Sequence, residues 1–387
     1  MATRKSSSQL RQTCRRAATH WLRQPTKSRV GPPRSDVDQT FRQPRFSALT
    51  RQPTEEVVER IFILSLVLSN AAVIAQAHEH DAERVADIVA MFAEDAIVGT
   101  PSIVDCKLSG GTDSHCVAIT VTGNPVDHAT GPWCPTNIAQ AGADVGGVWL
   151  DQDTVFEVDG DFIQSLPEIY NDEVWQLYNP ETGEVRVTDT LESCTLAARP
   201  RVDPGYNNYC VQCELSYMEG KTERTYVIPI TPVAADAARP IDDLGAGVAL
   251  NGVRIDGPAP ADAILAAHTI APFDDCGGHV NLGVGYHYHA VTGCSKEVAA
   301  AVAGHAPIIG IAMDGHMLHA QLDANGTEPR DLDVCRGHFV EGIGYHYHAN
   351  EASQNAIMTC HTAQVGCSNA GSETNCDATQ PLRRNRP

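Results

Sequence analysis

Residues 276–290 read CGGHVNLGVGYHYHA, and residues 335–349 read CRGHFVEGIGYHYHA. The offset between the two segments is 59 throughout, and ten of the fifteen positions are identical. This agreement indicates an internal duplication, or two halves of one site built alike.

The Tyr-His-Tyr-His run has a specific meaning in a β-strand, where successive side chains point to opposite faces. His287 and His289 then share one face, and Tyr286 and Tyr288 share the other. Two residues of strand span about 6.6 Å, which lets two imidazoles converge on one ion. The tyrosine rings would pack inward and fix the strand. The same alternation applies to His346 and His348.

A third ligand is available in each segment. His279 and His338 stand eight residues before the first histidine of each pair and are expected to reach it from a neighbouring loop. Three neutral imidazoles suit zinc or copper and leave a fourth position for water or substrate. The alternative is that these histidines are structural hydrogen-bonding groups. Cys276 and Cys335 are expected in disulfides rather than as thiolate ligands.

Histidines are concentrated in this part of the chain: residues 268–361 hold eleven of the sixteen. Between the two segments, His305 begins a stretch that ends in Asp314-Gly-His316, followed by His319. A strand with this ending presents a carboxylate and an imidazole at its C-terminal end. Asp314 and His316 are therefore the candidate catalytic groups, although Asp-Gly is also an ordinary turn.

The charge is unevenly distributed. Residues 1–60 carry 13 basic and 5 acidic residues, and the remainder carries 15 basic and 43 acidic residues. A surface this acidic repels phosphate backbones, so nucleic acid is excluded as a partner beyond the basic preamble. The preamble is rich in Arg, Gln, Pro and Ser, has no sustained periodicity and is predicted to be disordered.

An apolar run occupies residues 61–75 and is followed by Ala75-Gln-Ala77, which is typical of a signal-peptide core and its cleavage site. The run is short for a membrane span of about 20 residues. The 60-residue preamble is explained either by a start assigned too early or by a cytoplasmic tail on an uncleaved anchor. The protein is predicted to be extracytoplasmic, periplasmic or secreted, with a membrane contact only if residues 61–77 remain as an anchor.

Cysteine usage supports export. Twelve of the thirteen cysteines follow the apolar run, an even number that predicts up to six disulfides. Cys210-Val-Gln-Cys213 has the spacing of a redox or metal pair, but no helix pattern follows it.

Hydrophobic spacing predicts a mainly β fold: an antiparallel, disulfide-stapled domain with one or two short helices. Apolar residues at i, i+3, i+4 and i+7 predict a helix over 81–94, within an N-terminal lead-in at 78–116. Short β-branched runs predict strands at 116–122, 147–150, 184–188, 225–230, 247–253 and 307–313. Residues 234–240 are a candidate linker or long loop, 297–303 a possible helix, Asp159-Gly160 a turn, and 368–387 a polar tail.

With these motifs in view, the chain resembles the YHYH-domain family over about residues 117–367. Four further segments carry the resemblance: 123–128 (GNPVDH), 247–253 (GVALNGV), 275–279 (DCGGH) and 304–310 (GHAPIIG). The resemblance implies an exported β-rich domain with its histidines gathered near one place, so that His128 approaches the repeat as a further metal ligand. It implies no particular reaction.

One departure from the family pattern concerns Asp314-Gly315. The family usually continues with Phe-Pro-Ile-Tyr-Gly, whereas this chain continues with His316-Met-Leu-His319. The two extra histidines either enlarge a metal site or mark a repurposed pocket.

Three functions of different classes remain open. The first is an exported zinc- or copper-binding module, whose partner is the metal ion itself. The second is a metal-dependent hydrolase or oxidase with Asp314 or His316 as general base. The third is a structural or surface-interaction protein without metal. The sequence identifies no protein partner.

Overall fold

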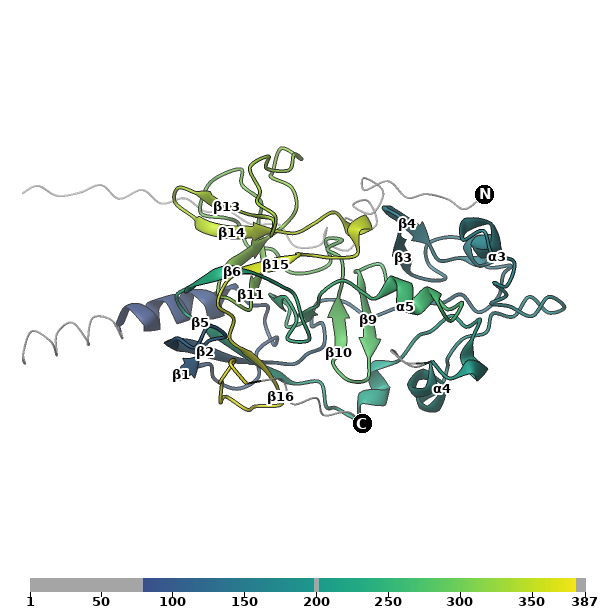
Figure 1. Cartoon of the computed structure of the whole chain (residues 1–387), viewed down its shortest axis with the longest axis horizontal. Helices are drawn as coiled ribbons and strands as arrows, with labels where there is room; N and C mark the ends of the chain where they lie inside the picture. Colours follow the sequence, from purple (N-terminus) through teal and green to yellow (C-terminus); the bar gives the residue numbers. More distant parts are fainter. Residues whose placement is uncertain (1–78, 198–201, 381–387) are drawn as a thin grey trace, which may run out of the picture. The chain divides into compact units, whose positions relative to one another are not determined.

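The computed structural model describes residues 79–197 and 202–380 (Figure 1). The predicted preamble and the apolar run at 61–77 lie outside these ranges. Residues 83–197 and 202–380 belong to one compact unit, and residues 79–82 belong to a second. Of the second unit only residues 79–82 are described, as the beginning of a helix over residues 79–91. Among the described residues, no helix has the length and apolarity that a membrane span requires.

The described part of the chain is mainly β with mostly antiparallel pairing, as predicted. In chain order the strands are β1 (Ser102–Lys107), β2 (Asp113–Val121), β3 (Val148–Asp151), β4 (Thr154–Glu157), β5 (Arg224–Pro229), β6 (Ala234–Pro240), β7 (Gly247–Ala249), β8 (Arg254–Ile255), β9 (Gly278–Asn281), β10 (Gly285–Tyr288), β11 (Ile308–Ala312), β12 (Met317–His319), β13 (Gly337–Val340), β14 (Gly344–His348), β15 (Cys360–Ala363) and β16 (Cys367–Ala370). Short helices that the sequence pattern did not predict are α3 (Gly160–Ile169), α4 (Leu191–Leu196) and α5 (Ala261–Leu265).

The eight-stranded sheet has the order β13-β14-β12-β11-β7-β8-β10-β9. Its two halves have the same pairings. In each, an edge hairpin (β13–β14 or β9–β10) pairs in parallel with a short strand (β12 or β8), which pairs antiparallel with a central strand. The central strands β11 and β7 are antiparallel neighbours.

The two Tyr-His-Tyr-His strands therefore lie near opposite edges of one sheet (Figure 1). From β14 to β10 there are five strand spacings of about 4.8 Å, or roughly 24 Å along the sheet. The structure thus keeps the two motifs apart and does not join them as halves of one site.

The central strands also contribute to a hydrophobic core with a second sheet, β1-β2-β5-β16. On β2, Val117 and Ile119 pack in this core with Val248 of β7 and Ile311 of β11. The alternate residues of β2 belong to a different core cluster, as the two-residue strand period requires. Phe92, just beyond the helix over 79–91, packs in the same core and covers part of it. This core fixes the middle of the large sheet, from which both edge hairpins extend.

Six disulfides use all twelve cysteines beyond the apolar run: Cys106–Cys116, Cys134–Cys210, Cys194–Cys213, Cys276–Cys294, Cys335–Cys360 and Cys367–Cys376. Cys210 and Cys213 bond to different partners, so the CxxC pair is structural.

Several local expectations were wrong. Residues 234–240 form strand β6, which pairs with β15, instead of a linker. Residues 297–303 are not helical, because Val298 makes an isolated bridge to Ile308. Asp159 is the N-cap of α3, with its side chain accepting from the Phe162 backbone N–H, rather than part of a turn. Residues 184–188 make isolated bridges instead of a regular strand.

Candidate metal centres

Each edge hairpin brings three histidines together through its register. His279 of β9 stands directly opposite His287 of β10, and His338 of β13 stands opposite His346 of β14. The expectation of a third ligand from a neighbouring loop was therefore wrong in detail, because the third histidine is a cross-strand neighbour. Side chains directly opposite one another in antiparallel strands have Cβ atoms about 5 Å apart, which is close enough for two imidazoles to meet.

Within the described residues, two groups of histidines have ligand atoms within 4.8 Å of one another. The first histidine cluster consists of His279, His287 and His289. The second histidine cluster consists of His305, His338, His346 and His348. Six of these seven residues were predicted as ligands. His305 was not, since it lies in a different segment of the chain, and only the local density of histidines pointed to it.

The second histidine cluster is arranged around a common point. The Nε2 atom of His346 lies 2.8 Å from that of His305, 3.0 Å from that of His338 and 3.2 Å from that of His348. The His338 and His348 Nε2 atoms are 3.1 Å apart. In a tetrahedral site with metal–nitrogen bonds of about 2.0–2.1 Å, the ligand nitrogens lie about 3.3 Å from one another. Four of the six distances among these atoms are thus close to the edge of a metal tetrahedron.

Each ring of the second cluster has an oxygen atom behind it at Nδ1. Hydrogen bonds at Nδ1 run from His338 to Asp331 Oδ1, from His346 to Gly344 O and from His348 to Ala320 O, each at 2.9 Å. Asp323 Oδ1 lies 3.1 Å from His305 Nδ1 as an ion-pair contact. A neutral imidazole has one N–H, and these acceptors place it at Nδ1. The lone pairs of the four Nε2 atoms then face one another, an arrangement that a cation stabilises.

Burial favours the uncharged form of three of these rings. Desolvation lowers the pKa of His346 to about 4 and that of His348 to about 3. It also lowers the pKa of His305. At neutral pH the lowered values keep the rings in the form that binds metals.

His319 lies beside the second cluster with one nitrogen unsatisfied. Its ring centroid is 4.3 Å from that of His346, and its Nδ1 donates to Ala306 O at 2.6 Å. The side chain is fully buried, and its Nε2 has no hydrogen-bond partner among the described residues. Leaving such a group unpaired costs about 1–3 kcal/mol. Of the two extra histidines noted in the sequence, His319 therefore lies beside the second cluster without being one of its four members.

The first histidine cluster has the same hairpin geometry but different surroundings. Its three ring centroids are 4.8–5.1 Å apart. His287 Nδ1 donates to Gly285 O at 2.9 Å, His289 Nδ1 donates to Gly257 O at 2.6 Å, and backbone carbonyls of residues 271 and 272 accept from His279. Desolvation by burial lowers the pKa of each ring to about 3.

The first cluster is packed by an aromatic ring and flanked by an ion pair. Phe273 is fully buried, with its ring centroid 4.8 Å from that of His279 and 5.1 Å from that of His289. Arg254 donates to both oxygens of Asp256, at 3.1 and 3.2 Å. Burial alone would favour protonated Asp256, but the Arg254 guanidinium outweighs it and holds the pKa of that carboxyl well below its usual range.

Asp256 and His319 occupy equivalent positions in the two halves of the sheet. Ile255 pairs with Tyr288 across β8 and β10, just as Leu318 pairs with Tyr347 across β12 and β14. The next residue is Asp256 in one half and His319 in the other. The chain therefore places a carboxylate beside the first cluster and an imidazole beside the second.

The tyrosines face away from the histidines, and the first tyrosine of each motif fixes its hairpin. The Tyr286 hydroxyl contacts both carboxylate oxygens of Asp274 at 2.8 and 2.9 Å, and the Tyr345 hydroxyl donates to Asp333 at 2.7 Å. Each aspartate also accepts backbone N–H groups at the beginning of its own hairpin. These tyrosine–aspartate hydrogen bonds confirm the expected role of the tyrosines, which is to fix the strands.

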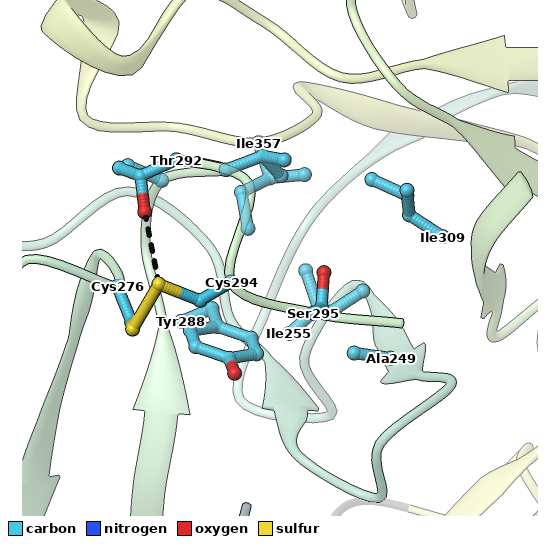
Figure 2. Close-up of a pocket in the computed structure, with 11 residues that line it drawn as sticks. Ala249, Ile255, Cys276, Tyr288, Thr292, Cys294, Ser295, Ile309 and Ile357 are labelled. Atoms are coloured by element: carbon cyan, nitrogen blue, oxygen red, sulfur yellow. Dashed lines mark hydrogen bonds between the residues drawn. A yellow bond between two sulfur atoms is a disulfide. The ribbon is translucent and has the colours of Figure 1, made fainter. Parts of the chain in front are cut away.

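A disulfide holds the base of each hairpin. Figure 2 shows Cys276–Cys294 beside Tyr288, where it ties the beginning of the first hairpin to the segment that follows it. The adjoining cavity, with Ile255 and Ile309 in its lining, has a volume of about 10 Å³, which is no more than one water molecule occupies. Cys335–Cys360 ties the second hairpin to β15.

The remaining site predictions fall on the tyrosine face. His128 joins neither cluster, because its ring lies 6.1–6.2 Å from those of Tyr286 and Tyr288, and its Nδ1 pairs with Asp127 at 2.8 Å. Asp314 is fully buried and accepts from the Tyr347 hydroxyl at 2.6 Å. His316 Nδ1 donates to Tyr345 O at 3.0 Å. The structure does not bring these three residues to either histidine cluster.

A family model described as YHYH protein matches residues 225–330. The matched segment contains the first hairpin and the central strands, and the second hairpin lies beyond it. No curated protein and no solved structure matches the chain. The chain therefore carries a domain of the YHYH protein family.

Proposed function

We propose that this protein is an exported metal-binding module that holds zinc or copper at two separate histidine centres. The observation that carries the proposal is the convergence of the Nε2 atoms in the second histidine cluster, within 2.8–3.2 Å of His346. Without a cation, four lone pairs would face one another in a site from which water is largely excluded. Imidazole is a good ligand for both metals, and the spacing fits the zinc tetrahedron.

The acceptors at Nδ1 support the same function. Hydrogen bonds of this kind orient ligating histidines and raise their basicity in metal proteins. His338, His346 and His348 each have one, and His305, which comes from a different segment of the chain, has the Asp323 carboxylate 3.1 Å from its Nδ1. Packing alone does not require four rings to direct the same nitrogen at one point.

The proposed compartment is extracytoplasmic. Six disulfides are typical of an oxidising environment. The apolar run at 61–75 and the following Ala75-Gln-Ala77 have the pattern of a cleaved signal peptide. Secretion from an expressing host, with sequencing of the mature N-terminus, tests this assignment.

Elemental analysis tests the metal. Protein secreted from an oxidising host and purified without affinity histidines should carry up to two equivalents of zinc or copper. His346→Ala with His348→Ala should remove one equivalent, and His287→Ala with His289→Ala should remove the other. His268→Ala is the matched control, because His268 pairs with Asp172 at 2.8 Å and belongs to neither cluster. Absence of metal, with none taken up on titration, would make both hairpins structural.

A further inference from the structure

We infer that the two centres select ions of different charge: the second histidine cluster a divalent cation, Zn²⁺, and the first a monovalent one, Cu⁺. The inference rests on the proposed function, since it concerns which ion each centre binds. Its basis is the inventory of ligands and fixed charges around each cluster.

Two carboxylates beside the second cluster balance the double positive charge of a divalent ion. Asp323 Oδ1 lies 3.1 Å from His305 Nδ1 and Asp331 accepts from His338 at 2.9 Å, so two carboxylates stand directly behind two of the four rings. Four neutral imidazoles contribute no charge of their own. A divalent ion in their midst is thus balanced by two negative charges at hydrogen-bond distance from its ligands. Four nitrogens also satisfy the tetrahedral preference of zinc.

The first cluster lacks this compensation. Acceptors for its three rings among the described residues are backbone carbonyls, which are neutral. The carboxylate of Asp256 lies nearby but forms a two-bond ion pair with Arg254, and the pair has no net charge. Both side chains are held in place, because Arg254 is buried and also donates to the Asp243 backbone oxygen at 2.9 Å.

Because the first cluster is buried, this difference in compensating charge decides which ion it can bind. The free energy needed to desolvate an ion rises with the square of its charge, so a divalent ion is about four times harder to bury than a monovalent one. His287 and His289 are 3% and 5% exposed, and Phe273, which packs on the cluster, is fully buried. Three imidazoles complete the low coordination number that Cu⁺ accepts, whereas Zn²⁺ requires a fourth ligand. The competing arrangement is Zn²⁺ with a bound hydroxide, which would also lower the buried charge.

Parallel titrations separate these outcomes. The secreted full-length protein, freed of metal, is titrated with Zn²⁺ and, without oxygen, with Cu⁺ held reduced by ascorbate, which spares the disulfides. His346→Ala with His348→Ala should leave one Cu⁺ site whose preference for Cu⁺ over Zn²⁺ is at least about 100-fold. His287→Ala with His289→Ala should leave one Zn²⁺ site. Tighter binding of Zn²⁺ than of Cu⁺ at the first centre, or the same preference at both centres, overturns the inference.

Charge variants test the cause. Asp323→Asn should weaken Zn²⁺ binding at the second centre by about 10–100-fold and leave the first centre unchanged. Glu341→Gln, at an exposed position on the β13–β14 turn, is the charge-matched control. Arg254→Met, which introduces the residue found at the equivalent Met317, should release Asp256 and shift the first centre toward Zn²⁺. Arg254 is buried, so the Arg254→Met variant can fail to fold. In that case Asp323→Asn alone tests the charge argument. Equal Zn²⁺ affinity in Asp323→Asn and Glu341→Gln contradicts the charge argument.

Failure of the inference differs from failure of the proposed function. If unaltered protein binds neither Zn²⁺ nor Cu⁺, the metal-binding function itself is wrong. If it binds two ions that do not differ in charge preference between the centres, the function stands and the selectivity is wrong.

Discussion

His338 and His346 face each other across the β13–β14 hairpin with their Nε2 atoms 3.0 Å apart. Behind them, His338 Nδ1 is bonded to Asp331 and His346 Nδ1 to Gly344 O, each at 2.9 Å. Each of the two rings is thus fixed by a hydrogen bond at Nδ1, and their Nε2 atoms face each other. Hydrogen bonding cannot join two nitrogens that both lack a proton, and a shared cation can.

Removing His338 should weaken the second centre severely. Loss of a partner behind a metal ligand costs about 10–100-fold in affinity, so loss of the ligand itself should exceed about 100-fold. His338→Ala, compared with Asp331→Asn, separates ligation from support: the first should abolish tight binding and the second should only weaken it. Competition with a chromophoric chelator measures both. Equal affinities for the two variants would contradict ligation by His338.

The metal-free protein should lose stability in acid. The pKa of each ring in the first cluster is lowered by burial to about 3, below the ordinary value of about 6.5 in the unfolded chain. Between these values the unfolded state binds more protons, so the free energy of unfolding falls as the pH drops from about 6.5 toward 3. Each ring contributes up to about 1.4 kcal/mol per pH unit in this window.

Urea denaturation of chelator-treated protein at several pH values measures this slope. His287→Ala with His289→Ala should show a shallower dependence, because two of the three titrating rings are gone. A slope as steep in the variant as in the unaltered protein would assign the acid sensitivity to other groups.

Tyr286→Phe should destabilise the first hairpin without removing a metal ligand. The hydroxyl is bonded to both oxygens of the buried Asp274 carboxylate, and leaving that carboxylate short of a donor costs about 1–3 kcal/mol. Tyr217→Phe is the control, because its hydroxyl donates to the Asp189 backbone oxygen at an exposed site. Denaturation midpoints measure the difference. Equal midpoints for the two variants would mean that Tyr286 does not fix the hairpin.

Breaking Cys335–Cys360 should lower stability and loosen the second centre together. The bond closes a loop with a sequence separation of 25, worth about 3.5 kcal/mol in the chain-entropy model. It joins the beginning of β13 to β15, so its loss also frees the base of the hairpin that carries His338. Replacing Cys367 and Cys376 by serine is the control. That variant should lower stability while metal binding at the second centre stays unchanged.

The alternation of Tyr and His along a strand was readable from the sequence alone, because side-chain direction in a strand depends on local backbone geometry. It correctly placed His287 with His289, and it placed the tyrosines on the other face. The cysteine number likewise anticipated six disulfides. A short local pattern was less reliable where a distant partner decided the outcome, as when 234–240 became strand β6 by pairing with β15.

Tertiary structure alone decided what surrounds each motif. The order of strands in the large sheet separates the two hairpins, and no local pattern encodes that order. His305 and the carboxylate of Asp323 reach the second cluster from the segments flanking β11 and β12, whereas His128 is directed to the tyrosine face. These contacts join residues far apart in the chain, so their register is set by packing of the whole sheet. The sequence thus determined the ligand types and their alternation, and the fold determined how many converge and which charges stand behind them.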